Sequence, residues 1–172
     1  MNLQYISDRS FRIPETFILK KGWTVFTCDG RAEESLGATA YISSLWDRWM
    51  ASNHVMRVIP RSGFRPGYLY LALRSPFVQI QIKSRATGNV VDALDVPTVS
   101  AVLLPVLQKK QRDELGMEAE KAWEKVADAL RLEEQTVTAL EKLIVDSYES
   151  NRSSCVGTKG QAGYSSRTTR CT

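Results

Sequence analysis

Residues 109–150 have the sequence KKQRDELGMEAEKAWEKVADALRLEEQTVTALEKLIVDSYES. Apolar residues recur in it at heptad spacing, which is typical of a helix that packs against another helix. Position a takes Trp123, Leu130, Val137 and Ile144, and position d takes Ala119, Val126, Glu133 and Leu140. A helix of about 40 residues would be about 60 Å long, longer than a small domain requires. The pattern therefore predicts a long C-terminal helix with an apolar stripe that needs a partner.

Two interpretations of this stripe stay open. The helix could pack on the rest of the chain, or it could form an intermolecular coiled coil, which its length and its small residues Ala122 and Ala129 at position g favour. Gly116 at the first a position and Glu133 at a d position interrupt the pattern. A polar residue such as Glu133 in a seam can specify register at a cost in stability. The predicted helix interface consists of Trp123, Val126, Leu130, Val137, Leu140 and Ile144.

Charge is distributed very unevenly along the chain. The net charge is +4, but residues 109–150 hold eleven acidic and seven basic side chains. Residues 48–91 hold no acidic side chain and seven basic ones: Arg48, Arg57, Arg61, Arg65, Arg74, Lys83 and Arg85. A concentrated basic region is typical of a surface that contacts a polyanion. The charge pattern therefore suggests a body that touches a polyanion and a helix that touches protein.

Residues 1–106 read as a small mixed α+β domain. Alternating β-prone residues predict strands at 23–28, 37–42 and 54–59, and the apolar run 99–104 predicts a final strand. The segment 43–52 is either a short helix or a packed loop. Pro66 and the pair Ser75-Pro76 are good helix starts, so two short helices are expected over 68–73 and from 76 to about 82.

The domain organisation follows from these elements. A domain over 1–106 precedes a spacer or dimerisation helix over 107–150, and the Ser-, Gly- and Arg-rich tail 151–172 is expected to be disordered. No run of about 18 apolar residues occurs and the N-terminus lacks a signal-peptide core, so a cytoplasmic protein without a membrane partner is expected. Three scattered cysteines and one histidine favour no metal site.

DNA contact is the functional interpretation of the basic region, against an ordinary solvated surface as the alternative. Arginine and lysine can neutralise phosphates, arginine can bridge guanine O6 and N7, and asparagine can bridge adenine. The loops at 61–67 and 83–89 carry such side chains, and Arg57 lies on the strand before them. The predicted DNA-binding residues are Arg57, Arg61, Ser62, Arg65, Lys83, Ser84, Arg85, Thr87 and Asn89.

Other candidate sites have weaker support. Asn53 and His54 have no serine or cysteine motif to pair with, so a polar strand edge is the better interpretation than catalysis. Trp46 and Trp49 could stack on bases, but loop or core packing is favoured. The acids at 29, 33 and 34 lie in one loop, without the strand-borne lysine and carboxylates that a metal-dependent nuclease needs. The sequence also contains no glycine-rich nucleotide-binding loop.

Four stretches in this order give the chain a family resemblance. They are FILKKGWTVFT (17–27), NHVMRVIP (53–60), GYLYLALRSPF (67–77), and VSAVLLP (99–105) followed by Gln111 and the long helix. Over residues 15–148 the chain resembles the DNA-specificity (S) subunit of type I restriction–modification systems, as part of one target-recognition domain with one spacer helix. It departs where Cys28-Asp29-Gly30 stands in place of the family's Ser-Gly pair. Several tens of further residues would also precede Met1 in a complete domain, so the resemblance implies a half-subunit or a fragment.

The resemblance implies a non-catalytic subunit that reads one half of a bipartite target in double-stranded DNA. Methyltransferase and restriction subunits would be its partners, and they would hold S-adenosylmethionine, ATP and magnesium, so this chain would need no cofactor. Two spacer helices pack antiparallel in the family, which implies self-association or a second S-type half. The alternative function is a coiled-coil adaptor whose basic domain binds an acidic protein.

Overall fold

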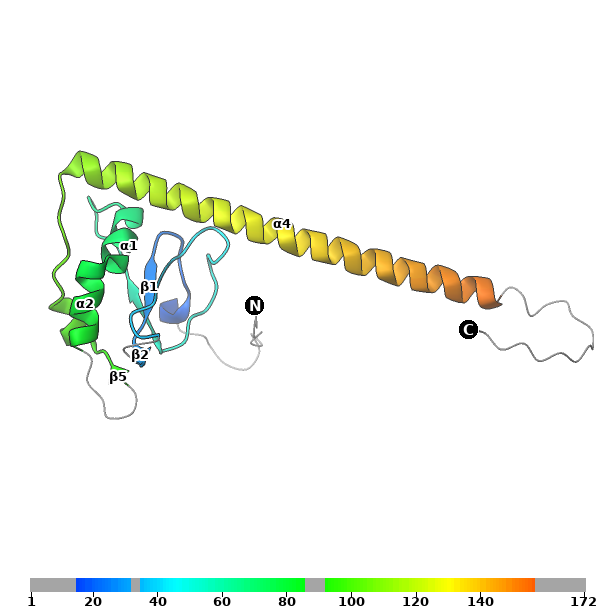
Figure 1. Cartoon of the computed structure of the whole chain (residues 1–172), viewed down its shortest axis with the longest axis horizontal. Coiled ribbons are helices and arrows are strands. Elements are labelled where there is room, and N and C mark those ends of the chain that lie inside the picture. The colour runs from blue at the N-terminus through cyan, green and yellow to red at the C-terminus, as the bar shows by residue number, and fades with distance from the viewer. Residues whose placement is uncertain (1–14, 32–34, 86–91, 157–172) are drawn as a thin grey trace, which may run out of the picture. The chain divides into compact units, whose positions relative to one another are not determined.

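The computed structural model describes residues 15–31, 35–85 and 92–156 (Figure 1). The chain divides into two compact units, of which the first ends at Asp128 and the second begins at Ala129. The first unit combines a small sheet with helices, so the predicted α+β class is confirmed. In order, the elements are η1 (Glu15–Phe17), β1 (Thr24–Thr27), β2 (Asp29–Gly30), β3 (Thr39–Tyr41), β4 (Val55–Val58), α1 (Pro66–Arg74), α2 (Pro76–Ser84), β5 (Asp92–Ala93), α3 (Val96–Ser100) and α4 (Lys109–Val156).

The main sheet is antiparallel, with β1 between β3 and β4. These are the three strands that alternation predicted, shortened by one or two residues at their ends. Phe26 lies opposite Thr39 on one side and Met56 on the other, and Val25 lies opposite Ala40 and Arg57. Because side chains alternate between the faces of a strand, Phe26 and Val25 point into different layers.

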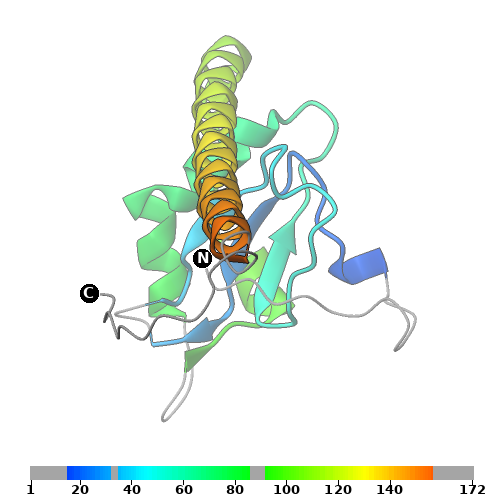
Figure 2. The same ribbon diagram turned by 90° about the vertical axis from the view of Figure 1, so that its right-hand side faces the viewer.

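Both faces of this sheet are covered. Phe26 packs in the main core with Leu69 and Leu73 of α1 and with Val78 and Ile82 of α2. Figures 1 and 2 show α2 on that side of the strands. On the opposite face, Val25 packs with buried Leu19 and Ile42 and with half-buried Trp46. The segment 43–52 is therefore a packed loop rather than a helix, and Trp46 and Trp49 meet edge to face with ring centroids 5.0 Å apart.

Local capping explains the short helices. Pro66 stands in the first turn of α1, and the Ser75 hydroxyl accepts a hydrogen bond from the Val78 amide at 3.4 Å to cap α2. Asp95 caps α3 in the same way, because its carboxylate accepts from the Thr98 amide at 2.8 Å. Val99 therefore lies in a helix, and the prediction of a strand over 99–104 was wrong.

A second, two-stranded sheet pairs β2 with β5, and Asp29 lies opposite Ala93. This pairing joins the end of β1 to the segment after α2, because the Leu94 amide also donates to the Cys28 carbonyl at 2.9 Å. The sheet places Leu94 in the main core.

The long C-terminal helix is confirmed as α4, 48 residues from Lys109 to Val156. It continues through 151–156, the beginning of the segment that was expected to be disordered, while 157–172 lie outside the described residues. In the described part of the chain, no helix has the length and apolar content needed to cross a membrane.

Candidate nucleic-acid interface

Arg57 on β4 is bonded within the chain. Its guanidinium donates to the Ala51 carbonyl at 3.0 Å and to the Ser52 carbonyl at 3.4 Å, and it lies 5.3 Å from the centre of the Phe17 ring. These contacts fasten the loop before β4 to the sheet. A phosphate would have to compete with these contacts for the guanidinium. The main role of Arg57 is therefore structural.

Arg61 is the most accessible of the predicted arginines. It opens a turn that the Phe64 amide closes by donating to the Arg61 carbonyl at 3.0 Å. Gly63 supplies the positive φ of 83° in this turn, and a side chain there would meet open space. Arg61 and Ser62 are both exposed. Within the described ranges, the Arg61 side chain has no hydrogen bond or ion pair, so its five donors are available to a ligand.

Arg65 is paired with α4. Its guanidinium lies 3.0 Å from one carboxylate oxygen of Glu120, and the other oxygen accepts from the Gly67 amide at 2.9 Å. Glu120 thus binds both the residue before α1 and the first turn of α1, where a negative charge is favoured by the helix dipole. Arg65 holds α4 in place, in addition to any contact with a ligand.

The first turns of α4 cross α1 at a close approach of two glycines. A Cβ on Gly116 would lie 2.9 Å from the Tyr68 amide nitrogen, and a Cβ on Gly67 would collide with the Gly116 carbonyl oxygen. Beyond the crossing, the rings of Trp123 and Tyr70 meet edge to face with their centroids 5.7 Å apart. Gly116 is therefore a contact position, although the heptad pattern marks it as an interruption.

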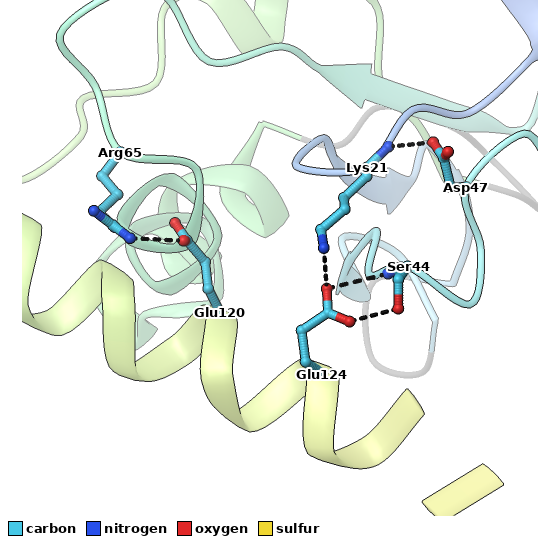
Figure 3. Close-up of polar contacts among 6 residues, drawn as sticks. All are labelled: Lys21, Ser44, Asp47, Arg65, Glu120 and Glu124. Atoms are coloured by element: carbon cyan, nitrogen blue, oxygen red, sulfur yellow. Dashed lines mark hydrogen bonds and ion pairs between the residues drawn. The ribbon is translucent and has the colours of Figure 1, made fainter. Parts of the chain in front are cut away.

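After Glu120, Glu124 makes the second polar contact between α4 and the rest of the first unit (Figure 3). Its carboxylate lies 2.8 Å from the Lys21 ammonium and accepts from both the amide and the hydroxyl of Ser44. Burial alone would raise the pKa of Glu124, but the hydrogen bonds from Lys21 and Ser44 outweigh it and hold the pKa below its ordinary value of 4.5. The folded chain therefore favours the charged carboxylate.

Tyr41 lies beneath this junction. Burial raises the pKa of its hydroxyl to about 12, and the nearby charges of Glu120 and Glu124 add to the effect. The ring packs edge to face against Tyr70 at 6.1 Å. Tyr41 is thus a neutral core residue near the carboxylates of Glu120 and Glu124.

The second predicted loop begins at the end of α2. Lys83 and Ser84 are exposed, and Ser84 and Arg85 both donate to the Gln81 carbonyl, at 3.1 and 3.0 Å. Arg85 therefore caps its own helix. Thr87 and Asn89 lie outside the described residues.

The described residues of the two predicted loops lie at different ends of the first unit. The loop at 61–65 lies against α4 through Arg65, whereas α2 ends on the side of the first unit where β2 and β5 lie (Figure 1). Among the described residues, Arg61 and Ser62 thus form one candidate contact region, and Lys83 and Ser84 form another.

Asn53 and His54 are bonded to other residues of the first unit. His54 bonds through its ring to the Asp29 carboxylate, and the Asn53 carbonyl accepts from the buried Cys28 thiol at 3.6 Å. Burial raises the pKa of that thiol, which disfavours a nucleophilic thiolate. No group of histidine, cysteine and acidic residues able to hold a metal occurs in 15–31, 35–85 and 92–156.

The predicted helix-interface residues divide between two environments. Trp123 is half-buried against Tyr70. Leu130 is partly exposed, and four members of the stripe are exposed: Val126, Val137, Leu140 and Ile144.

Sequence reasoning missed the junction residues Glu120, Glu124, Lys21 and Ser44. Each is an ordinary polar residue in its local pattern, and its partner is distant in the chain: Ser44 lies 80 residues before Glu124, and Lys21 lies farther still. The one available signal was Gly116, since a glycine inside a long helix often marks a close contact.

Comparisons with known proteins were negative: no protein-family model matches the chain, and no curated protein is significantly similar to it.

Proposed function

We propose that this chain is a DNA-specificity subunit, or half-subunit, of a type I restriction–modification complex. It would read one half of a bipartite target in double-stranded DNA without catalysing a reaction. Methyltransferase and restriction subunits would supply the chemistry. The second half would come from another copy or from a second S-type chain.

The observation that carries the proposal is the exposed Arg61, whose side chain has no partner among the described residues, on a turn followed by residues bonded to the N-terminal part of α4. Arg65 and Gly67, which follow that turn, both bind Glu120 of α4. A side chain able to reach a base edge therefore lies on a turn that is bonded to the N-terminal part of a potential spacer. This is the arrangement needed to hold two DNA-reading domains at a set distance.

The exposed stripe of α4 supports the partner requirement. Leu140 and Ile144 expose 57% and 51% of their surface, far more than a helix of one isolated domain would leave at spaced apolar positions. The same stripe also favours the alternative function, a coiled-coil adaptor whose basic domain binds an acidic protein.

Fluorescence anisotropy with a labelled duplex separates these two functions. We expect the wild-type chain to bind duplex DNA with an affinity that falls as salt rises, because phosphate contacts release counterions. We expect an acidic polypeptide of equal charge to displace the duplex poorly. Absence of binding, or equal displacement by the acidic polypeptide, would contradict the proposal and favour the adaptor.

A further inference from the structure

The beginning of α4 carries an unusual charge. Its first residues are Lys109, Lys110 and, after Gln111, Arg112, and its first turn holds no acidic residue. The N-terminus of a helix is the positive end of its dipole, where negative charge is stabilising. Three cations therefore stand where the helix itself favours an anion.

These cations lie beside the turn that presents Arg61. The Arg112 guanidinium is 4.8 Å from the centre of the Phe64 ring, and Phe64 closes that turn onto Arg61. Lys109 and Arg112 precede Gly116 by seven and four residues and so share its helix face, and a Cβ on Gly116 would lie 2.9 Å from both Arg65 and Tyr68. Figure 1 shows the chain before α1 next to the first turns of α4.

The charges of this corner are not neutralised within the described residues. Arg61, Lys109 and Lys110 are exposed, and no ion pair engages them in that part of the chain. The nearest acids along α4 are Asp113 and Glu114, and the Glu120 carboxylate is already bound to Arg65. We call Arg61, Lys109, Lys110 and Arg112 the basic corner.

We propose that the basic corner binds the phosphate backbone of duplex DNA and so fixes the base of α4 directly on the DNA. This inference rests on the proposed function and assigns it a contact outside the two loops. Lysine contacts to phosphate add affinity without sequence preference, while Arg61 beside them can reach base edges. The DNA would then set the position of the spacer helix as well as that of the reading loop.

The test compares two variants of equal charge change. In Lys109→Gln/Lys110→Gln the basic corner loses two cations. In Lys125→Gln/Lys142→Gln two exposed lysines elsewhere on α4 are lost. Binding to a labelled random-sequence duplex is measured by anisotropy over a range of KCl, after circular dichroism has verified equal helix content.

We expect the corner variant to bind about tenfold more weakly at low salt. The slope of log affinity against log salt should become less negative by about two, which is about one for each lost phosphate contact. The control should keep nearly the wild-type affinity and slope. Equal behaviour of both variants and the wild type would overturn the basic corner alone. A wild type that binds no duplex would overturn the corner and the proposed function together.

Discussion

Three arginines that lie close together in the sequence, Arg57, Arg61 and Arg65, have different roles because each has different contacts. Arg57 binds carbonyls of the loop before β4, Arg65 binds Glu120, and Arg61 is exposed with no side-chain partner among the described residues. Composition assigns the same DNA-binding role to all three. The contacts indicate that only Arg61 can meet a ligand without first breaking a bond within the chain.

Replacing Arg61 tests base reading. We expect Arg61→Ala to weaken binding to a preferred duplex by about 1–3 kcal/mol and binding to random DNA by less. Arg61→Lys keeps the charge but loses the planar fork, so it should retain random-DNA affinity and lose discrimination. Anisotropy on both duplexes measures this. Equal losses on the two duplexes in Arg61→Ala would show a phosphate contact instead.

Glu124 should make the stability of the fold depend on pH in the acidic range. Its pKa is lower in the folded chain, so the charged carboxylate stabilises the fold above the ordinary value of 4.5, and this stabilisation is lost as pH falls through the lowered value. Glu124→Gln should therefore be less stable than the wild type at neutral pH, with a difference that shrinks in acid.

Urea unfolding at neutral and acidic pH measures this difference, and Glu118→Gln is the matched control because Glu118 forms only an exposed pair with Lys121. A deficit of Glu124→Gln that stays the same at both pH values would contradict the assigned role of the carboxylate.

The crossing of α1 and α4 determines whether Gly116→Ala stabilises or destabilises the folded chain. In an isolated helix, Gly116→Ala would stabilise by about 1 kcal/mol. In the folded chain the new Cβ would lie 2.9 Å from the Tyr68 amide nitrogen and from an Arg65 side-chain carbon. We expect a net destabilisation of about 1–3 kcal/mol, as for other overpacked contacts.

Thermal or urea unfolding measures this change, and Thr138→Ala on an exposed turn of α4 is the control, since it raises helix propensity and removes only an exposed hydrogen bond to the Glu134 carbonyl. A Gly116→Ala chain that is more stable than the wild type would show that α4 does not pack on α1 at this point.

Elements with strong local signals could be predicted from the sequence. Alternation identified β1, Pro66 identified the start of α1, and the heptads identified α4. The strand predicted over 99–104 was wrong because the Asp95 cap and Pro97 start a helix that includes Val99. The pairing of β2 with β5 and the bonds of Glu120 depend on contacts between distant segments, which no local pattern records.

At the scale of the whole molecule, the stripe of α4 should hold two chains together. Leu140 and Leu132 are both exposed, but only Leu140 lies at a seam position of the heptad. We expect Leu140→Lys to dissociate the wild-type assembly, because a charge in the seam would be desolvated, and Leu132→Lys to leave it intact. Sedimentation velocity distinguishes these outcomes. A wild-type monomer would contradict self-association and leave a second S-type half as the partner.

Reading of DNA sequence by this chain is tested by selection from a library of duplexes with a randomised segment. We predict that a short sequence is enriched and that its duplex binds at least about tenfold tighter than a scrambled version, which corresponds to about 1.4 kcal/mol. A bound pool that stays as random as the input, or equal affinities for the two duplexes, would contradict the claim.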